Sequence, residues 1–451
     1  MLFPRLRLTL WPLALAALAV MWSPRPGRAQ IMSARRMAMG GVTLMHGGPG
    51  SDIANVAYRA VPIDPRERVC SFSLPLGVIQ TLRDKPSFDT KDSTFNAFKL
   101  ADLGLHLPWN IALTKPKEPA DDVTITVSRT SLVIDLGVLR DIIPTDRMRF
   151  ADAMRGPAFV LGVKRAFIGI SPYVNVQNDF QLGDALRDAL HDGRPFVPFT
   201  TYGLHDHGTA QAAVQAMAGG AFALVRASPQ SRDGVYVGAR ARVLRGMAYA
   251  DANETVSFTT PDTLFGTAPL DLNLDGRMRS ATPSGGGIGH GFDAGVVFVA
   301  RGVELGLAAN DLSTSIDWKV KETRTAKDST SGDYKTVTVA TDQAYTSTIP
   351  ASYLLTAATH LGDIYVAADA VRDGLAQMTG HIGAEYWLGA VALRGGAWDD
   401  SAKRVQVSGG IGVRLGRIGL DVALATNQEN LTHERTLDLG AGLSWYPRRK
   451  S

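Results

Sequence analysis

The sequence contains one cysteine, Cys70, among 451 residues. No intramolecular disulfide is possible, which excludes the disulfide scaffolds of small secreted domains. Long apolar runs are also missing after residue 29, where no stretch reaches the ~18 residues of a transmembrane helix. Residues 208–227 come nearest, but Gln211 and Gln215 interrupt them, and we predict a short helix that leads into a strand.

Catalytic and cofactor motifs are absent as well. There is no P-loop, no Gly-x-Ser-x-Gly element and no zinc-protease pattern. His205, Asp206 and His207 are consecutive, and three consecutive residues do not surround a tetrahedral metal. Basic residues do not alternate with aromatic residues in a stripe, as nucleic-acid binding would require. We therefore expect a protein that is not an enzyme, carries no cofactor or metal and binds no nucleic acid.

For one stretch of the sequence, a metal site is an alternative to a polar turn. Asp271, Asn273, Asp275 and Gly276 match the first half of a calcium-binding loop, with oxygen ligands at alternate positions before a glycine. The twelfth position, where such a loop has a bidentate glutamate, is Thr282 instead. The stretch is either a polar turn or a loop that holds calcium.

The first 29 residues have the pattern of a secretory signal peptide. Arg5 and Arg7 precede an apolar run from residue 8 to 22, and Gly27 and Ala29 supply the small residues of a cleavage site. The run is short for the alternative, an N-terminal membrane anchor. Removal of this segment takes away four of the 47 basic residues and no acidic one, so 43 basic and 43 acidic residues remain. We expect an exported chain without net charge.

The exported part alternates between apolar and polar residues, most clearly in 361–446. Every odd position of 404–415 is aliphatic or glycine, and every even position of 418–424 is aliphatic. A period of two is the period of a strand, and the stretches suit the ~9–11 residues of a barrel strand. A soluble β-sandwich would show a break where strands change sheet, and 351–446 shows none. The sequence therefore predicts an all-β protein, a transmembrane antiparallel β-barrel.

The expected barrel has long loops at one end and short turns at the other. At roughly 28 residues per hairpin, the chain accommodates about fourteen strands. The polar stretches 252–289 and 319–349 are predicted to be the long outer loops. In the less regular part we predict strands at 71–82 and 122–127, a strand or short helix at 133–143, and a helix at 181–190.

A separate sequence pattern occurs in residues 33–57. The matching residues are Ala34, Arg35, Met37, Met39, Gly40 and Gly41, followed by Asn55 and Ala57. This pattern resembles the N-terminal signature of the FadL-like superfamily of outer-membrane β-barrels, which includes PorV-like and conjugal-transfer TraF-like members. Looser matches continue in 236–251 and 289–318, and Val56 stands where the signature has a proline.

The resemblance implies a domain order. It implies a plug or hatch segment at 30–60, which follows the predicted signal peptide at 1–29 and precedes the predicted outer-membrane barrel at 61–446 and a tail at 447–451. It also implies a Gram-negative outer membrane. Without the resemblance, 30–60 would be a disordered leader or a first strand. The candidate residues of the plug and its gate are Met39, Gly40, Gly41, Asp52 and Asn55.

Charged residues on the polar faces of the strands form a second candidate set. Near the midplane of a bilayer, a charge on the lipid-facing side would cost roughly 2–4 kcal/mol, so we expect these side chains in the lumen. They either satisfy one another as a structural ion network or line the path of a solute. The set consists of Arg240, Arg242, Asp369, His381, Glu385, Arg394, Arg404, Arg414, Arg417 and Asp421.

Two functions of different classes follow. The first is passive uptake of a hydrophobic or amphipathic small molecule through the barrel, opened by movement of 30–60. The second is a component of a secretion or conjugal-transfer system that binds partner proteins through its long loops. Outer-membrane lipid is an expected partner in both cases.

Overall fold

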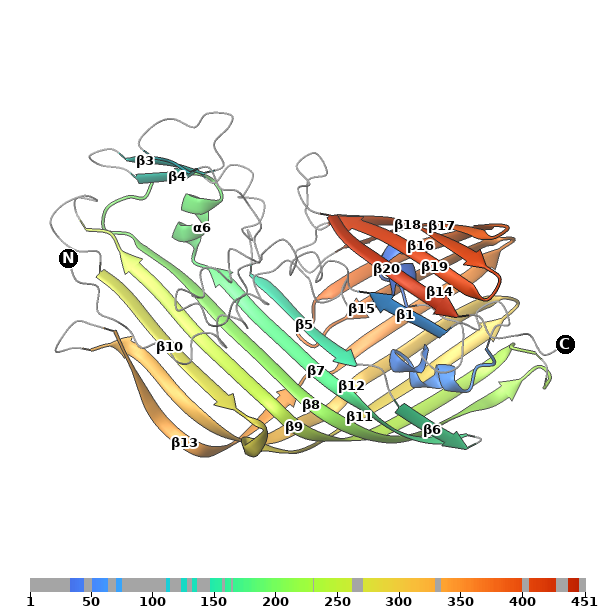
Figure 1. The fold of residues 1–451 in the computed structure, drawn as a ribbon. Helices are drawn as coiled ribbons and strands as arrows, with labels where there is room; N and C mark the ends of the chain where they lie inside the picture. Colours follow the sequence, from blue (N-terminus) through green and yellow to red (C-terminus); the bar gives the residue numbers. More distant parts are fainter. Residues whose placement is uncertain are drawn as a thin grey trace.

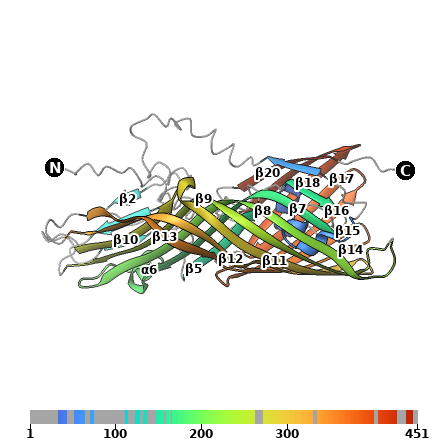
Figure 2. The same ribbon diagram turned by 90° about the horizontal axis from the view of Figure 1, so that it is seen from below.

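The chain forms an antiparallel β-barrel whose interior contains the N-terminal segment (Figures 1 and 2). In the computed structural model, the main sheet has seventeen strands among the described residues. The described residues are 33–43, 51–63, 70–74, 111–113, 123–127, 132–135, 147–155, 159–163, 165–229, 231–261, 271–328, 334–399, 405–426 and 437–445.

The C-terminal third is a meander in which each strand pairs with the next from β14 to β20. The predicted alternation decides which face is buried: Ile382 of β16 is 55% exposed, whereas Glu385 of the same strand is 1% exposed. The exposed aliphatic face is the surface that a barrel presents to lipid. The strands are β14 (Ser352–Leu361), β15 (Ile364–Arg372), β16 (Met378–Leu388), β17 (Val391–Asp399), β18 (Val405–Leu415), β19 (Ile418–Thr426) and β20 (Leu437–Trp445).

Tight turns close the hairpins at one end of the barrel. Gly302, Gly362, Gly389 and Gly416 all have φ between 61° and 82°. Arg301 and Gly302 both have positive φ, at 51° and 82°, which is the type I′ turn that matches the twist of paired strands. The connections at the other end are longer, as the asymmetry of outer-membrane barrels predicts.

The other wall contains much longer strands. β8 and β9 have 26 residues each, far more than the ~9–11 that cross a bilayer. The strands are β7 (Ala166–Leu182), β8 (Thr201–Arg226), β9 (Gly234–Thr259), β10 (Asp271–Ala281), β11 (Gly286–Ala300), β12 (Val303–Lys327) and β13 (Tyr334–Ile349). β1 (Cys70–Leu74) pairs with β20, and β5 (Met148–Arg155) and β6 (Phe159–Val163) pair with β7.

These long strands correct three predictions. The described residues of the expected outer loops 252–289 and 319–349 are largely strand, and 208–226 is strand without the short helix that we predicted before it. The Asp271–Gly276 stretch is part of β10 and not a turn or loop. We name the protruding strand ends the distal ribbon, defined as residues 201–211, 249–259, 271–281, 319–327 and 334–346. Much of its surface is exposed and polar, so the apolar alternation that marks a half-buried strand is missing from its sequence.

The strand number exceeds the expected value of about fourteen because several strands are interrupted. The 3-10 helix η5 (Pro283–Gly285) separates β10 from β11, and Pro350 follows the last residue of β13. Residues 156–158, between β5 and β6, lie outside the described residues. Counting each interrupted pair as one strand brings the structure back to the expected number.

Smaller elements complete the fold. α6 (Asp184–Leu190) packs with Phe180, Phe196 and Tyr202 in a small apolar core at the ribbon end. It is shorter than the predicted helix because Gly183 is its N-cap and β7 extends through Leu182. β2 (Ile111–Leu113), β3 (Val123–Val127) and β4 (Leu132–Asp135) form a separate three-stranded sheet within the predicted barrel range. The N-terminal segment contains α3 (Ala34–Ala38), η1 (Ser51–Ile53) and η2 (Val56–Arg59).

Candidate functional site

The N-terminal segment lies across the interior and contacts two different parts of the wall. α3 packs against β17, β18, β19 and β20, whereas η2 packs against β8, β9 and β11 (Figure 1). Met39, Val42, Ala57 and Tyr58 are completely buried in the core between segment and wall. The candidate site is therefore built from this segment and the strand faces that it covers.

The local sequence explains how α3 starts and stops. Ser33 caps the helix, and its Oγ accepts a hydrogen bond from the Arg36 amide at 3.3 Å. Gly40 and Gly41 follow the helix with φ of 70° and 77°. A Cβ on Gly40 would lie 2.6 Å from the carbonyl oxygen of Ile382. The position requires glycine both for its backbone angle and for its close contact with the wall.

The wall is also glycine where it meets α3. A Cβ on Gly396 would lie 2.1 Å from the Gly40 nitrogen, and one on Gly383 would lie 2.3 Å from the Met39 oxygen. Met39 itself has no exposed surface. Segment and wall are thus in backbone contact, and the wall strands have glycine at both contact positions.

A first ion network joins α3 to three strands. Arg35 donates to both carboxylate oxygens of Glu385, at 2.8 and 2.6 Å. Arg394 Nε donates to the same carboxylate at 2.6 Å, and Arg394 Nη1 donates to Asp421 at 2.6 Å. Two positive and two negative charges therefore balance in a buried site. Buried charges persist in proteins when they are paired in this way.

Three further hydrogen bonds hold the chain after α3. Ser408 Oγ accepts from the Gly40 amide at 3.0 Å, and a carboxylate oxygen of Asp369 accepts from the Thr43 amide. Nδ1 of His381 lies 2.7 Å from the Gly40 carbonyl oxygen. Since a carbonyl oxygen only accepts, this ring nitrogen carries the proton.

The second half of the segment is held by the Asn55 side chain and by its own backbone carbonyls. Asn55 Nδ2 donates to the carbonyl oxygens of Val296 and Leu307, both at 3.2 Å, while its Oδ1 accepts from the Ala57 amide at 3.0 Å and caps η2. Asn310 Nδ2 donates to the Ala54 carbonyl at 3.0 Å. Asp52 forms an ion pair within the segment, with Arg59 at 3.0 Å.

A second ion network lies against η1. Arg240 Nε donates to Asp293 at 2.7 Å, Arg242 Nη2 donates to Asp311 at 2.6 Å, and Arg155 Nη2 donates to Asp311 at 2.8 Å. Three arginines thus face two carboxylates. Arg155 and Arg240 also donate to the Ile53 carbonyl, each at 3.4 Å. The segment therefore supplies acceptors to a network that has one more positive than negative charge.

A β-bulge places Asp311 in this network. Asp311 and Ser313 have positive φ, at 61° and 47°, and the β11–β12 register shifts nearby. The Asp311 amide donates to the Asp293 side chain at 2.8 Å. A bulge redirects side chains and leaves backbone groups outside the ladder. Positive φ at a non-glycine residue is a strained conformation of the kind that occurs at functional sites.

Some of the site residues predicted from the sequence take part in these contacts, and others do not. All five plug residues are in the segment, and Arg240, Arg242, Asp369, His381, Glu385, Arg394 and Asp421 belong to the contacts above. Arg414 and Arg417 do not, because they flank the tight turn between β18 and β19 and are exposed. Arg404 lies outside the described residues. Sequence reasoning missed Arg35, Arg155, Asp293, Asn310 and Asp311, although Asp293 and Asp311 are isolated acids within strand patterns.

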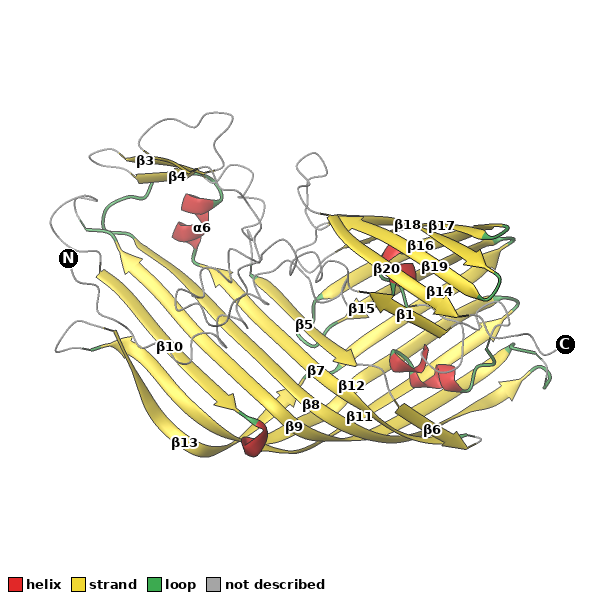
Figure 3. Ribbon diagram, viewed as in Figure 1, coloured by secondary structure: helices red, strands yellow, loops and turns green. Residues whose placement is uncertain are grey.

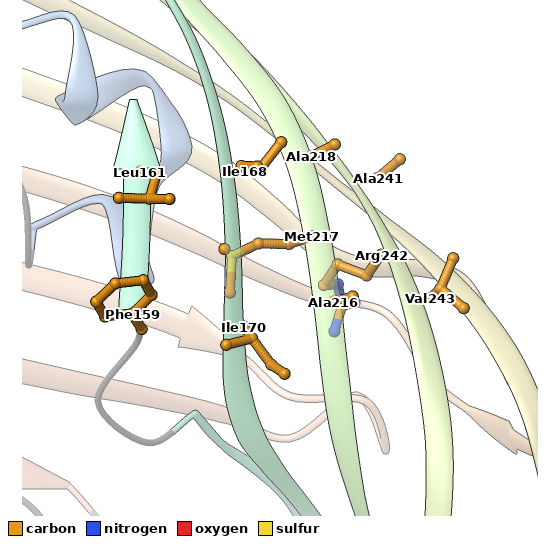
Figure 4. Close-up of a pocket in the computed structure, with 11 residues that line it drawn as sticks. Phe159, Leu161, Ile168, Ile170, Ala216, Met217, Ala218, Ala241, Arg242 and Val243 are labelled. Carbon is orange, nitrogen blue, oxygen red and sulfur yellow. The ribbon is translucent and has the colours of Figure 1, made fainter. Parts of the chain in front are cut away.

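Two hollows lie in the described part of the barrel, one beside the segment and one between strands of the wall. A cavity of about 240 Å³ lies between the segment and strands β5, β7, β12, β14, β15 and β16, and its lining is mixed polar and apolar. A second hollow of about 490 Å³ lies between β6, β7, β8 and β9 and is almost entirely apolar. Figure 4 shows Phe159 and Leu161 beside Ile168, with Ala216 and Ala218 on the next strand. Most of these side chains are on the exposed, aliphatic face of the wall.

The distal ribbon has ionisable groups of its own. Burial and the nearby Glu254 raise the pKa of Asp206 to about 6. The hydrogen bond to Asp251 raises the pKa of His207, which lies 3.3 Å from that carboxylate. Asp275, from the suggested calcium stretch, accepts two hydrogen bonds from Arg324, at 3.1 and 2.9 Å. This arginine occupies the carboxylate that would have served as a calcium ligand.

The described part of the chain gives two further findings. None of its helices has the length and apolar composition of a membrane span (Figure 3). Within the same residues, histidine, cysteine and acidic side chains do not gather into a group that would hold a metal ion.

Comparison with known proteins finds similarity only at the level of three-dimensional structure. No protein-family model matches the chain, and no curated protein matches it. The toluene transporter TbuX of Ralstonia pickettii is 14% identical, with 71% of this chain and 95% of that chain covered and a TM-score of 0.32. The monoaromatic hydrocarbon channel CymD is 12% identical over 71% of this chain and 95% of its own, with a TM-score of 0.30.

A mutant of the monoaromatic hydrocarbon channel TodX is 14% identical, with 71% of this chain and 96% of that chain covered and a TM-score of 0.26. These three structures are FadL-family transporters, and the sequence resemblance pointed to the same group. All the TM-scores are below 0.5, so the barrel and the site rest on the strand pairings and contacts described above.

Proposed function

We propose that the protein is an outer-membrane channel for passive uptake of hydrophobic or amphipathic small molecules. The observation that carries the proposal is the N-terminal segment, whose described residues occupy the interior and are held there by hydrogen bonds, ion pairs and packing. Arg35 binds Glu385 at one side, and the Ile53 carbonyl meets Arg155 and Arg240 at the other. A segment held by such bonds is able to leave and return, as a gate requires.

The surfaces around the segment support a solute with an apolar part. The outer face of the wall is aliphatic, which supports a location in a lipid bilayer, and the predicted signal peptide would direct the export of the chain. The cavity beside the segment has both polar and apolar lining, which suits an amphipathic molecule.

A reversible crosslink tests whether the segment is the gate. A Cβ on Gly440 would lie 3.7 Å from the Cβ of Ala34, close to the ~3.8 Å of a disulfide. The variant Ala34→Cys with Gly440→Cys, in a Cys70→Ser background, would fix α3 to β20. Outer-membrane vesicles should take up a radiolabelled amphipathic probe with reductant and lose that uptake on oxidation. Deletion of 33–55 should leave uptake high under both conditions.

Single-cysteine variants are the controls for the crosslink. The single variants Ala34→Cys and Gly440→Cys, in the same background, should show no response to oxidation. Uptake that is equal in the oxidised and reduced double variant would remove α3 from the gate. Equal and negligible uptake by wild type and the deletion variant would remove the channel function.

A second candidate is the docking of partner proteins, as part of a secretion or conjugal-transfer system. The distal ribbon favours it, because β13 is exposed on both faces from Lys335 to Val339, and Val337 and Val339 are more than half exposed. Trimming of residues 323–340 should remove a stoichiometric partner and leave probe uptake unchanged. Loss of uptake with no loss of a partner would reject this candidate.

A further inference from the structure

The apolar hollow between β6, β7, β8 and β9 lies on the outer side of the barrel wall (Figure 4). We name it the outer hollow, defined by residues 159, 161, 168–170, 216–218 and 241–243. Ile168 in its lining is 60% exposed, whereas the preceding residue on β7, Phe167, is 3% exposed and packs against Val56 of the segment. The wall therefore separates the outer hollow from the segment, and the hollow opens on the lipid-facing side.

The strand register explains why the wall is hollowed at this place. Ala218 pairs with Ile168 on one side and with Ala241 on the other, and Ala241 pairs with Phe292. Two alanines therefore lie side by side between two large, exposed side chains. The volume of about 490 Å³ equals that of about sixteen water molecules at ~30 Å³ each. One acyl chain with a similar number of carbon atoms fits this space.

A cation lies beside the outer hollow. Arg245 follows Val243 by two residues on β9, so both side chains are on the same face of the sheet. Arg245 is exposed, and the residues paired with it are Val214 on β8 and Ile288 on β11, which do not neutralise its charge. Arg242 also lines the hollow, but its side chain has no exposed surface and belongs to the interior ion network. Arg245 is therefore a charge that a molecule in the outer hollow can reach.

The position of Arg245 along β9 corresponds to the edge of the apolar band. β9 begins at Gly234, at the end of the barrel opposite the ribbon, and Arg245 is eleven residues farther along. At ~3.3 Å per residue and a strand tilt of ~40°, this length rises ~28 Å through the bilayer. The apolar band of such barrels is ~25 Å tall. A guanidinium at this level meets lipid headgroups, whose phosphates accept paired hydrogen bonds from arginine.

Two interactions would distinguish a lipid held here from the lipid around it. Acyl chains already surround the wall, so a further apolar molecule gains no hydrophobic energy, and only its close packing in the hollow counts. The second interaction is the contact between the phosphate and Arg245. A molecule without an anionic group would use only the packing, and a soluble anion would use only the charge.

We propose that the outer hollow and Arg245 form a binding site for a phosphate-bearing membrane lipid, with one acyl chain in the hollow and the phosphate on Arg245. The site lies on the opposite side of the wall from the segment. It is therefore independent of the proposed uptake function.

Native mass spectrometry of the purified barrel in detergent tests the lipid class, because it resolves the first bound lipid molecule and gives its dissociation constant. The probes are dipalmitoyl phosphatidylglycerol and dipalmitoylglycerol, which have the same chains and differ in the phosphate headgroup. The phospholipid should bind at least about tenfold more tightly. Equal or tighter binding of dipalmitoylglycerol would overturn the proposal.

Two variants place the lipid in the outer hollow. Ala218→Leu fills the hollow without a change of charge, and Arg245→Gln removes the charge without filling the hollow. Each should weaken binding of the phospholipid by about tenfold or more. The matched controls are on β15, where Ala368 lies between buried residues and so faces outward, and Arg372 is exposed at the same end of the barrel as Arg245.

Ala368→Leu and Arg372→Gln should bind the phospholipid as wild type does. Losses of equal size in these controls would assign the binding to general contacts of the wall with lipid and overturn the site. Unchanged affinity in either Ala218→Leu or Arg245→Gln would also overturn it, since the proposal requires both the packing and the charge.

Discussion

Opposite charges meet in two regions of this barrel, and their surroundings differ. In the interior, Asp293 is 1% exposed and faces Arg155, Arg240 and Arg242. In the distal ribbon, Arg324 and Asp275 form a one-to-one pair whose side chains are 56% and 51% exposed. Water screens the ribbon pair, so it adds little to stability, whereas each interior charge depends on its neighbours.

The difference shows which charges fix the structure. The ion pair of the ribbon links side chains of β10 and β12, and backbone pairing already joins these two strands. In the interior network around Glu385, the charges join the segment to the wall, because Arg35 is in the segment while Glu385 and Arg394 are in strands. A change in the interior should therefore alter both folding and gating, and the same change in the ribbon should alter neither.

The largest expected effect comes from removing a shared interior carboxylate. Glu385→Ala would leave Arg35 and Arg394 without their common partner. The loss of one partner of a buried pair costs about 3–5 kcal/mol, so the urea midpoint of the barrel should fall and the segment should become accessible to protease. Both are measured on purified protein in detergent.

The matched ribbon change is Asp275→Ala, which removes an exposed partner of Arg324. It should leave the urea midpoint and protease pattern as in wild type. Glu385→Gln, which keeps the side-chain shape, should fall between wild type and Glu385→Ala. Equal losses from Glu385→Ala and Asp275→Ala would end the distinction between the two regions.

A smaller effect is expected from adding one methyl group where the segment touches the wall. Gly396→Ala places a Cβ 2.1 Å from the Gly40 nitrogen, and overpacking of this kind costs about 1–3 kcal/mol. The segment should be displaced, which protease accessibility and probe uptake both detect.

Two glycines serve as controls for that methyl group. At Gly395 the nearest atom would be 4.0 Å away, and at Gly276 in the ribbon it would be 3.7 Å away. Alanine at either position should leave the segment protected. A displaced segment in Gly395→Ala, or a protected one in Gly396→Ala, would contradict the close packing described here.

The smallest effect concerns Asp206, a ribbon carboxyl that is only 7% exposed and so resembles the interior. Its pKa is raised to about 6 by burial and by Glu254, with Asp179 acting in the same direction and His207 against it. Because the folded state holds this proton more tightly than the unfolded state, the stabilisation is present below about pH 4 and is lost as pH rises through about 6.

Hydrogen exchange of the β8–β9 tip, corrected for intrinsic rates, measures this loss. The protection factor should fall between pH 4 and pH 6 in wild type, and Asp206→Asn should flatten the profile and keep protection at pH 7. The raised pKa of His207 produces a separate decrease in stability at higher pH, as the bond to Asp251 loses its charge. An unchanged profile in Asp206→Asn would assign the pH dependence to other groups.

The sequence supported parts of this picture well and others poorly. Alternation in 404–415 and 418–424 predicted strands and the face that each exposes, because one side of those strands meets an apolar environment. The parts of the distal ribbon in 252–289 and 319–349 were predicted as loops because they lack that one-sided environment. Residues 208–227 were predicted as a short helix that leads into a strand, yet 208–220 pair with β7 and 208–226 pair with β9.

The residues of the candidate site were also predicted in part, according to whether their role depends on neighbouring or on distant residues. Met39, Gly40 and Asn55 were found because they belong to a recognisable local pattern. Arg35 lies in the same pattern, but its role depends on Glu385, which is 350 positions away. Asp311 required a bulge that no local sequence feature announces. Arg414 was assigned to the lumen by strand parity, and the tight turn beside it places it in solvent instead.

The sequence alone determined the strand period, the polarity of each strand face and the glycines that allow close backbone contact, because these properties depend on neighbours within a few residues. Only the tertiary structure decided which charges share a buried site, how far the strands extend beyond the apolar band and where the cavity lies. Those features depend on groups that are distant in the chain and become neighbours only when the sheet curves around the segment.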